Sequence, residues 1–218
     1  MKRGVKICGL TEVQGLRAAC DERAEWIGFV FFARSPRFVT PVQAARLVSS
    51  ISTPLPETVG LFVKATDEEI AATLTEMPLS VLQIYDTPER ARSIRERFSL
   101  PVWLSRAVSG TGDLPTEADI DGYVIEPRPP AGATRPGGNG VTLDWRLMRS
   151  WQAPAPWMLA GGLTPESVAD AIVASGAQAV DVSSGVETAP GQKSPELIRN
   201  FIKNARSASV GTCAPERN

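Results

Sequence analysis

Short apolar runs alternate with helix-start signals along most of this 218-residue chain. Eight of the runs have the length and composition of β-strands, and each is followed by helical or helix-like sequence. A repeated βα unit makes consecutive strands parallel, because the helix returns the chain to the starting edge of the sheet. The runs occupy residues 4–8, 26–31, 58–63, 80–84, 102–105, 121–125, 157–160 and 178–182.

Helix-start signals follow most of these runs. Some are capping boxes, in which Ser or Thr is followed three residues later by Glu or Gln. Others place proline at the first helical position after a hydroxyl residue. The sequence therefore predicts capping boxes at Thr11 and Thr66, and proline-type starts at Thr40, Thr87, Thr164 and Ser194. The signals after the fifth and sixth runs are weaker, with a short stretch at 114–118 and Asp144-Trp145.

Eight βα units in a chain of this length predict the α/β class and a single-domain (β/α)8 TIM barrel. We place the barrel in residues 1–206 and expect residues 207–218, which are small and polar, to form a disordered tail. A doubly wound open sheet is the alternative. It would be favoured by G-x-G-x-x-G after the first strand, and Cys8-Gly9-Leu10-Thr11 does not match that motif.

Composition excludes several classes of function. The 23 basic and 24 acidic residues give a net charge of -1, so we expect no nucleic-acid partner. We expect neither a membrane span nor a secretory signal. The three cysteines are widely spaced and odd in number, which indicates neither a disulfide framework nor a metal site. A cytoplasmic protein is the resulting expectation. The chain has no histidine, so acid–base chemistry falls to Cys, carboxylate, Lys or Tyr groups.

Catalytic groups of βα barrels lie at the carboxyl ends of the strands. Cys8 ends the first run, where it is either a buried small hydrophobe or a general base whose pKa is lowered by cations such as Lys6. Glu126 follows the sixth run and is either a loop-edge charge or an acid. Opposite Cys8 it would complete the acid–base pair that an isomerisation needs.

Glycines and hydroxyl residues follow the last two runs. Backbone N–H groups at such loops bind phosphate, and the loops after strands seven and eight are the usual phosphate site in these barrels. The alternative is a pair of tight turns. The candidate phosphate ligands are Gly161, Gly162, Ser183, Ser184 and Gly185.

Three further strand-end residues are candidates for substrate binding. Arg37 lies in Ser35-Pro36-Arg37, where its planar guanidinium suits a substrate carboxylate. Gln83 and Asp181 lie near the ends of the fourth and eighth runs. We also expect the long Pro- and Gly-rich segment 127–141 to lie over the active site.

Several motifs together resemble the phosphoribosylanthranilate isomerase family of tryptophan biosynthesis. The resemblance implies an Amadori rearrangement of a phosphorylated small molecule without a metal or organic cofactor, in a monomer or homodimer. It makes Cys8 the general base, Glu126 the general acid and Arg37 the partner of the anthranilate carboxylate. It also adds Gly137 and Gly138 to the phosphate site. The matching stretches are 5–11, 27–40, 59–63, 81–84, 137–145, 159–165 and 181–187.

The sequence departs from the family pattern at the acid. The family has aspartate where this chain has Glu126, and the extra methylene moves the carboxyl by about 1.5 Å. Tyr85-Asp86 replaces a histidine and a glycine after the fourth run. Two alternatives therefore stay open: a related isomerase that acts on another phosphorylated aminosugar, and a barrel that binds a phosphorylated ligand without catalysis.

Overall fold

A computed structural model describes residues 3–130, 132 and 143–208. Gly137 and Gly138, most of segment 127–141 and the expected tail from residue 209 onward lie outside these ranges. The expectations for those residues therefore stay predictions.

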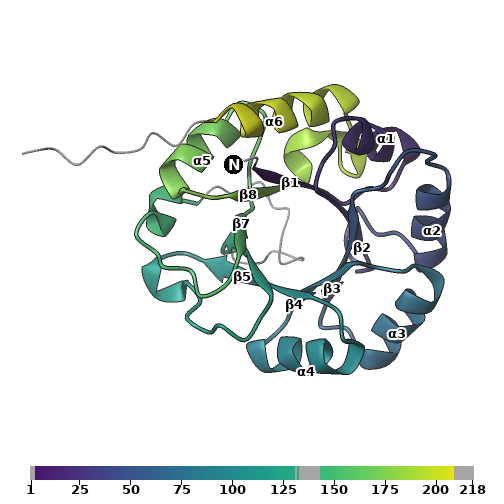
Figure 1. The fold of residues 1–218 in the computed structure, drawn as a ribbon, viewed down its shortest axis with the longest axis horizontal. Helices are drawn as coiled ribbons and strands as arrows, with labels where there is room; N and C mark the ends of the chain where they lie inside the picture. Colours follow the sequence, from purple (N-terminus) through teal and green to yellow (C-terminus); the bar gives the residue numbers. More distant parts are fainter. Residues whose placement is uncertain (1–2, 131, 133–142, 209–218) are drawn as a thin grey trace, which may run out of the picture.

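Eight parallel strands close into a barrel in the order in which they occur in the chain, as Figure 1 shows. The predicted (β/α)8 TIM barrel is confirmed. Closure joins the last strand to the first, with Lys6 opposite Asp181 in the register. The strands are β1 (Gly4–Cys8), β2 (Trp26–Val30), β3 (Glu57–Val63), β4 (Val81–Tyr85), β5 (Val102–Val108), β6 (Gly122–Pro127), β7 (Trp157–Leu159) and β8 (Ala179–Val182).

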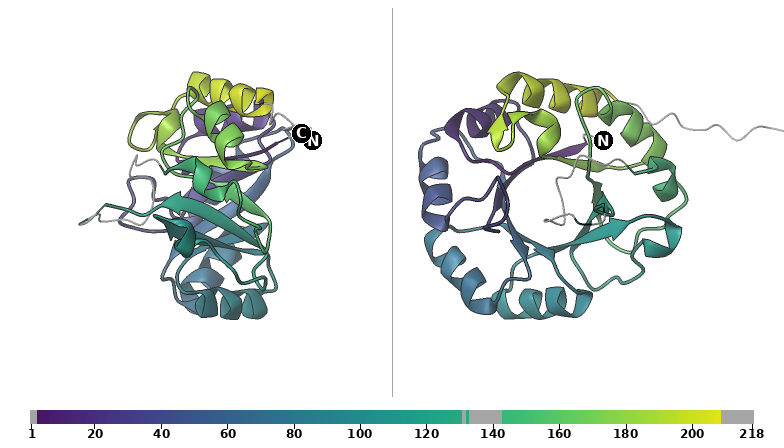
Figure 2. Two further views of the ribbon diagram at one scale, coloured as in Figure 1. Left: turned by 90° about the vertical axis from the view of Figure 1, so that its left-hand side faces the viewer. Right: turned by 180° about the vertical axis from the view of Figure 1, so that it is seen from behind.

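The helices surround the barrel on its outside, and the side view in Figure 2 shows the strands tilted within this ring. In the described residues, β5 and β6 are followed by the 3₁₀ helices η1 (Thr111–Asp113) and η2 (Trp145–Met148) in place of α-helices. The α-helices are α1 (Val13–Asp21), α2 (Pro41–Ser49), α3 (Asp67–Glu76), α4 (Pro88–Phe98), α5 (Val168–Ser175) and α6 (Pro195–Ser207). None of the helices in the described ranges is long and apolar enough to span a bilayer.

Four of the six predicted helix starts are confirmed. Thr40 and Thr66 form complete capping boxes. Thr87 and Ser194 each accept a hydrogen bond from the N3 backbone amide, and each is followed directly by a proline. These signals succeed because each cap is a hydrogen bond within four residues.

The predicted starts at Thr11 and Thr164 are wrong. Thr11 donates its hydroxyl to the Gly191 carbonyl at 2.6 Å, and α1 begins only at Val13. Thr164 closes a turn with Ser167, and α5 begins after that turn. In the first case a partner 180 residues away takes the hydroxyl. In the second case the turn occupies the residues after Thr164, so the helix begins only at Val168.

The hydrophobic core forms two layers, one outside and one inside the ring of strands. Alternate strand residues point outward and pack against the helices in one large cluster. The inward residues form a smaller cluster near the carboxyl ends, with Cys8, Val30 and Leu61, and another near the amino ends, with Val124 and Met158. The same alternation turns Lys6, Asp181 and Glu126 inward, so the polar groups of the barrel interior come from separate strands.

Candidate active site

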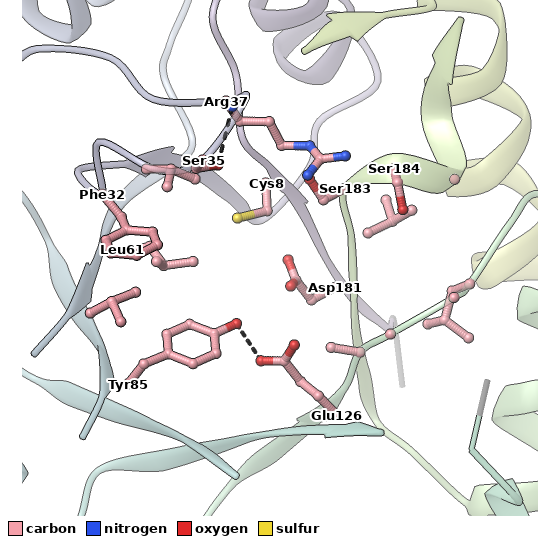
Figure 3. Close-up of a pocket in the computed structure, with 18 residues that line it drawn as sticks. Cys8, Phe32, Ser35, Arg37, Leu61, Tyr85, Glu126, Asp181, Ser183 and Ser184 are labelled. Carbon is pink, nitrogen blue, oxygen red and sulfur yellow. Dashed lines mark hydrogen bonds between the residues drawn. The ribbon is translucent and has the colours of Figure 1, made fainter. Parts of the chain in front are cut away.

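A pocket opens at the carboxyl ends of the strands, as predicted from the barrel fold. Cys8, Glu126 and Asp181 line it from β1, β6 and β8, and Tyr85 lines it from β4. Figure 3 shows the thiol and the two carboxyls directed into the same space. The structure therefore brings together the predicted acid and base, although they lie 118 positions apart in the numbering of the chain.

The Cys8 thiol faces the interior and is almost fully buried, with 3% of the residue exposed. Gly28 is its register partner on β2, where a Cβ would lie 2.9 Å from Sγ, so glycine makes room for the sulfur. Burial raises the pKa of Cys8, and Asp181 adds to this effect, whereas Lys6 and Lys193 lower it. The sequence made a pKa lowered by cations the condition for Cys8 to act as a base, and in the structure burial outweighs the two cations.

Lys6 and Asp181 form a buried ion pair beside the thiol. Their Nζ and Oδ1 atoms are 2.8 Å apart, and the Lys6 side chain is fully buried. Burial alone would lower the pKa of Lys6, but Asp181 and Cys8 raise it overall. Lys6 therefore stays charged, and the pair places a buried ammonium group beside a carboxyl group that lines the pocket.

Glu126 is the titratable group best suited to neutral pH. It is buried, with 6% exposed. Burial raises its pKa from 4.5 to about 7, with a contribution from Asp181, and hydrogen bonds from Tyr85 and Ser105 together with the charge of Lys6 oppose this rise. Tyr85 donates its hydroxyl to Oε1 of Glu126. Because about half of such a carboxyl is protonated near pH 7, it can serve as a proton donor there.

Gln83 lies beneath the residues that line the pocket. It is fully buried and is not among the described residues that line the pocket. Its Nε2 donates to Oγ of Ser105 at 2.9 Å, and the Ser105 hydroxyl in turn lowers the pKa of Glu126 and of Tyr85. The structure therefore places Gln83 in contact with a neighbour of Glu126.

The loops after β7 and β8 form the glycine-rich wall of the pocket, as predicted. Gly161, Gly162, Ser183, Ser184 and Gly185 all line it. Gly161 has φ +86°, and a Cβ there would lie 2.1 Å from Cδ of Pro127. A Cβ on Gly185 would lie 1.8 Å from the Leu163 carbonyl oxygen, so the two loops touch. Such close backbone packing suits a concave group of N–H donors for an anion.

Arg37 lies at the edge of the same wall, with its guanidinium held by a carboxylate of the chain. Nε and Nη2 each donate to Glu187 at 2.7 Å, and Lys193 Nζ contacts the same carboxylate at 2.7 Å. Lys193 also donates to the Ser183 carbonyl at 3.0 Å. Glu187 therefore occupies the bidentate edge of the guanidinium formed by Nε and Nη2, whereas we predicted a bidentate contact with a substrate carboxylate.

The Arg37–Glu187–Lys193 cluster predicts a large stability effect. All three side chains are at most 6% exposed, so Glu187→Gln leaves two cations facing a neutral group. We expect a loss of about 3–5 kcal/mol in the free energy of unfolding, measured by urea denaturation. The matched control is Asp119→Asn, which breaks the Arg92 pair at a 49% exposed carboxylate and should cost less than about 1 kcal/mol. Equal losses in both variants would contradict this account.

Three residues around the site were not predicted from the sequence, namely Ser105, Glu187 and Lys193. Glu187 and Lys193 come from the hairpin of β9 (Glu187–Ala189) and β10 (Gln192–Lys193). Lys193 carries no sequence signal, because its burial depends on packing against Gly15 of α1. Ser105 has one signal, since a hydroxyl at an inward position near the end of an apolar strand points toward the site.

Comparison with known proteins agrees with this geometry. The model of the N-(5'-phosphoribosyl)anthranilate (PRA) isomerase family matches residues 5–204. The N-(5'-phosphoribosyl)anthranilate isomerase of Acidiphilium cryptum is 51% identical over 204 residues, which cover 93% of this chain and 98% of the relative. That of Granulibacter bethesdensis is 46% identical over 206 residues, or 94% and 98% of the two chains.

Solved structures give the same result. The phosphoribosyl anthranilate isomerase of Thermotoga maritima superposes with a TM-score of 0.81 at 33% identity, covering 94% of this chain and 98% of that one. A structure of such an isomerase with reduced 1-(o-carboxyphenylamino)-1-deoxyribulose 5-phosphate has a TM-score of 0.79 at 32% identity, with the same coverage. On the evidence of its fold, its pocket and these matches, the chain belongs to the N-(5'-phosphoribosyl)anthranilate isomerase family.

Proposed function

We propose that this protein converts N-(5'-phosphoribosyl)anthranilate into 1-(2-carboxyphenylamino)-1-deoxyribulose 5-phosphate, an Amadori rearrangement of tryptophan biosynthesis. Family membership across residues 5–204 supports the reaction class. The observation that carries the proposal is the pocket itself. A thiol and a carboxyl with a pKa of about 7 face one space beside a glycine-rich wall.

The reaction needs one proton donor and one proton acceptor. Glu126 gives its proton to the ribose ring oxygen as the C1–O bond breaks, and the nitrogen lone pair forms the C1=N bond. The Cys8 thiolate then removes the C2 proton, and the electrons of the C2–H bond form C1=C2 while those of C1=N return to nitrogen. Movement of a proton from the C2 hydroxyl to C1 yields the aminoketose, and transfer of a proton from the Cys8 thiol through solvent to the Glu126 carboxylate restores both groups. Lys6 and Lys193 favour the thiolate that this step requires.

The walls of the pocket suit the two ends of this substrate. The loops that carry Gly161, Gly162, Ser183, Ser184 and Gly185 would take the phosphate. Arg37 Nη1 would meet the anthranilate carboxylate, and Asp181, whose Oδ1 binds Lys6, offers Oδ2 to a ribose hydroxyl. Each of these contacts follows from the position of the residue on the pocket wall.

Turnover of freshly generated phosphoribosylanthranilate, followed by the loss of its fluorescence, tests the proposal. We expect saturable turnover by the parent protein. Turnover of another phosphorylated aminosugar but not of this compound would replace the proposal with the related-isomerase alternative. Binding of the reduced product analogue without turnover of either compound would leave a ligand-binding barrel.

A further inference from the structure

We propose that Tyr85 is a positioning residue for the acid: its hydroxyl holds Oε1 of Glu126, so that Oε2 carries the proton to the substrate. The inference rests on the proposed function only in naming Glu126 as the acid. The contact itself is part of the described structure, since the Tyr85 hydroxyl donates to Oε1 and both residues line the pocket. Figure 3 shows the pair on the side of the pocket that faces Cys8 across the open space.

The Tyr85 ring lies at the end of β4. It packs against the inward cluster of Cys8, Val30 and Leu61. The Lys64 amide donates to the Tyr85 carbonyl at 3.1 Å, which fixes the backbone at this strand end. A phenol packed in this way directs its hydroxyl along one line, so Tyr85 engages Oε1 and leaves Oε2 to other partners.

The phenol remains a donor throughout the working pH range. Burial and the neighbouring Glu126 raise the pKa of Tyr85 well above its ordinary value. The hydroxyl therefore keeps its proton and donates to the carboxyl. This hydrogen bond favours the ionised carboxylate, because a donor stabilises the charged form of an acid. Tyr85 thus opposes the effect of burial on the pKa of Glu126. Its hydrogen bond helps to hold this pKa at about 7.

Gln83 and Ser105 support the pair from below. Gln83 Nε2 donates to the Ser105 oxygen at 2.9 Å, and this leaves the hydroxyl proton of Ser105 for a neighbouring acceptor. Ser105 lies on β5 between the strands that carry Tyr85 and Glu126. Gln83 therefore reaches the pair only through its amide nitrogen, and its Oε1 atom is buried without a hydrogen-bond partner among the described residues.

The length of the glutamate matches this arrangement. Tyr85 and Glu126 lie on β4 and β6, which are separated by β5, so their contact has to cross the barrel interior. Aspartate is shorter by one methylene, about 1.5 Å, which is half the length of a hydrogen bond. Tyr85 and Glu126 therefore form a matched pair in this chain.

The experiment compares Tyr85→Phe with Tyr123→Phe, because these are the two tyrosines of the chain. Tyr123 is also buried, and its hydroxyl donates to the Glu117 carbonyl at 2.6 Å. The carboxyl carbons are labelled with [5-13C]glutamate, and the Glu126 resonance is assigned with Glu126→Gln. We expect the titration of Glu126 to move above about pH 7 in Tyr85→Phe and to stay in place in Tyr123→Phe. We also expect kcat to fall about 10- to 100-fold with KM nearly unchanged in Tyr85→Phe alone.

A second measurement changes the donor without removing it. In the Tyr123→Phe background, 3-fluorotyrosine labels Tyr85 alone, and its more acidic phenol is a stronger donor that should lower the pKa of Glu126. An unchanged Glu126 titration in both the labelled protein and Tyr85→Phe would overturn the proposal. The titration is read without substrate, so a parent protein inactive toward phosphoribosylanthranilate would refute the proposed function while the titration still decides the role of Tyr85.

Discussion

Glu126→Gln is expected to lower kcat for phosphoribosylanthranilate by about 10²- to 10⁴-fold. The amide keeps the shape of the side chain and still accepts the Tyr85 hydrogen bond through its oxygen, but it has no proton to give to the ring oxygen. Fluorescence-monitored turnover measures the loss. A variant within about threefold of the parent would mean that another group is the acid.

The same substitution should change how stability depends on pH. The pKa of Glu126 is about 7 in the folded protein, against an ordinary value of 4.5, so the folded state binds the proton more tightly. The parent is therefore fully stabilised below about pH 4.5 and loses stability as the pH rises to about 7. This loss amounts to about 3 kcal/mol and is absent from the glutamine variant.

Urea denaturation of the parent and of Glu126→Gln at about pH 4.5 and pH 8 measures this effect. The glutamine variant should gain relative to the parent between the two pH values. A constant difference between the two proteins would show that Glu126 titrates at its ordinary pKa, and the assignment of a neutral-pH acid would then fail.

Cys8→Ala is expected to lower kcat by about 10²- to 10⁴-fold, because it removes the group that we propose as the acceptor of the C2 proton. The control is Cys20→Ala, which removes the other buried thiol of the described residues from α1, away from the pocket. This control should retain the kcat of the parent. Equal losses in both variants would point to a packing effect and would contradict the role of Cys8 as base.

The reactivity of the Cys8 thiol offers a measurement that does not depend on turnover. Burial raises the pKa of Cys8, so its alkylation by iodoacetamide should be slow at neutral pH and should accelerate above the ordinary cysteine value of 9.0. The reduced product analogue should protect Cys8. Rapid alkylation at pH 7 would show that the cations outweigh burial, in the direction that the sequence first suggested.

Local sequence predicted those features that depend on neighbours in the chain. The strand periodicity predicted the barrel, since alternating βα units have few compact arrangements. Caps such as Thr40 and Thr66 were predictable because donor and acceptor are three residues apart. The barrel rule then placed Cys8 and Glu126 at strand ends, where the structure has them.

The features that were mispredicted or missed depend on distant partners. Thr11 binds Gly191 and therefore does not cap a helix, and Arg37 binds Glu187, 150 residues away. The Tyr85–Glu126 contact joins two strands that are not adjacent in the barrel. No spacing within the chain encodes these contacts.

The sequence by itself thus determined the architecture, the strand ends and the chemical types of the site residues. Only the tertiary structure decided their protonation and their partners. A pKa is set by the sum of burial and charges around one group, and around Cys8 the charges come from Lys6, Asp181 and Lys193. That sum exists only after barrel closure has brought β1 beside β8.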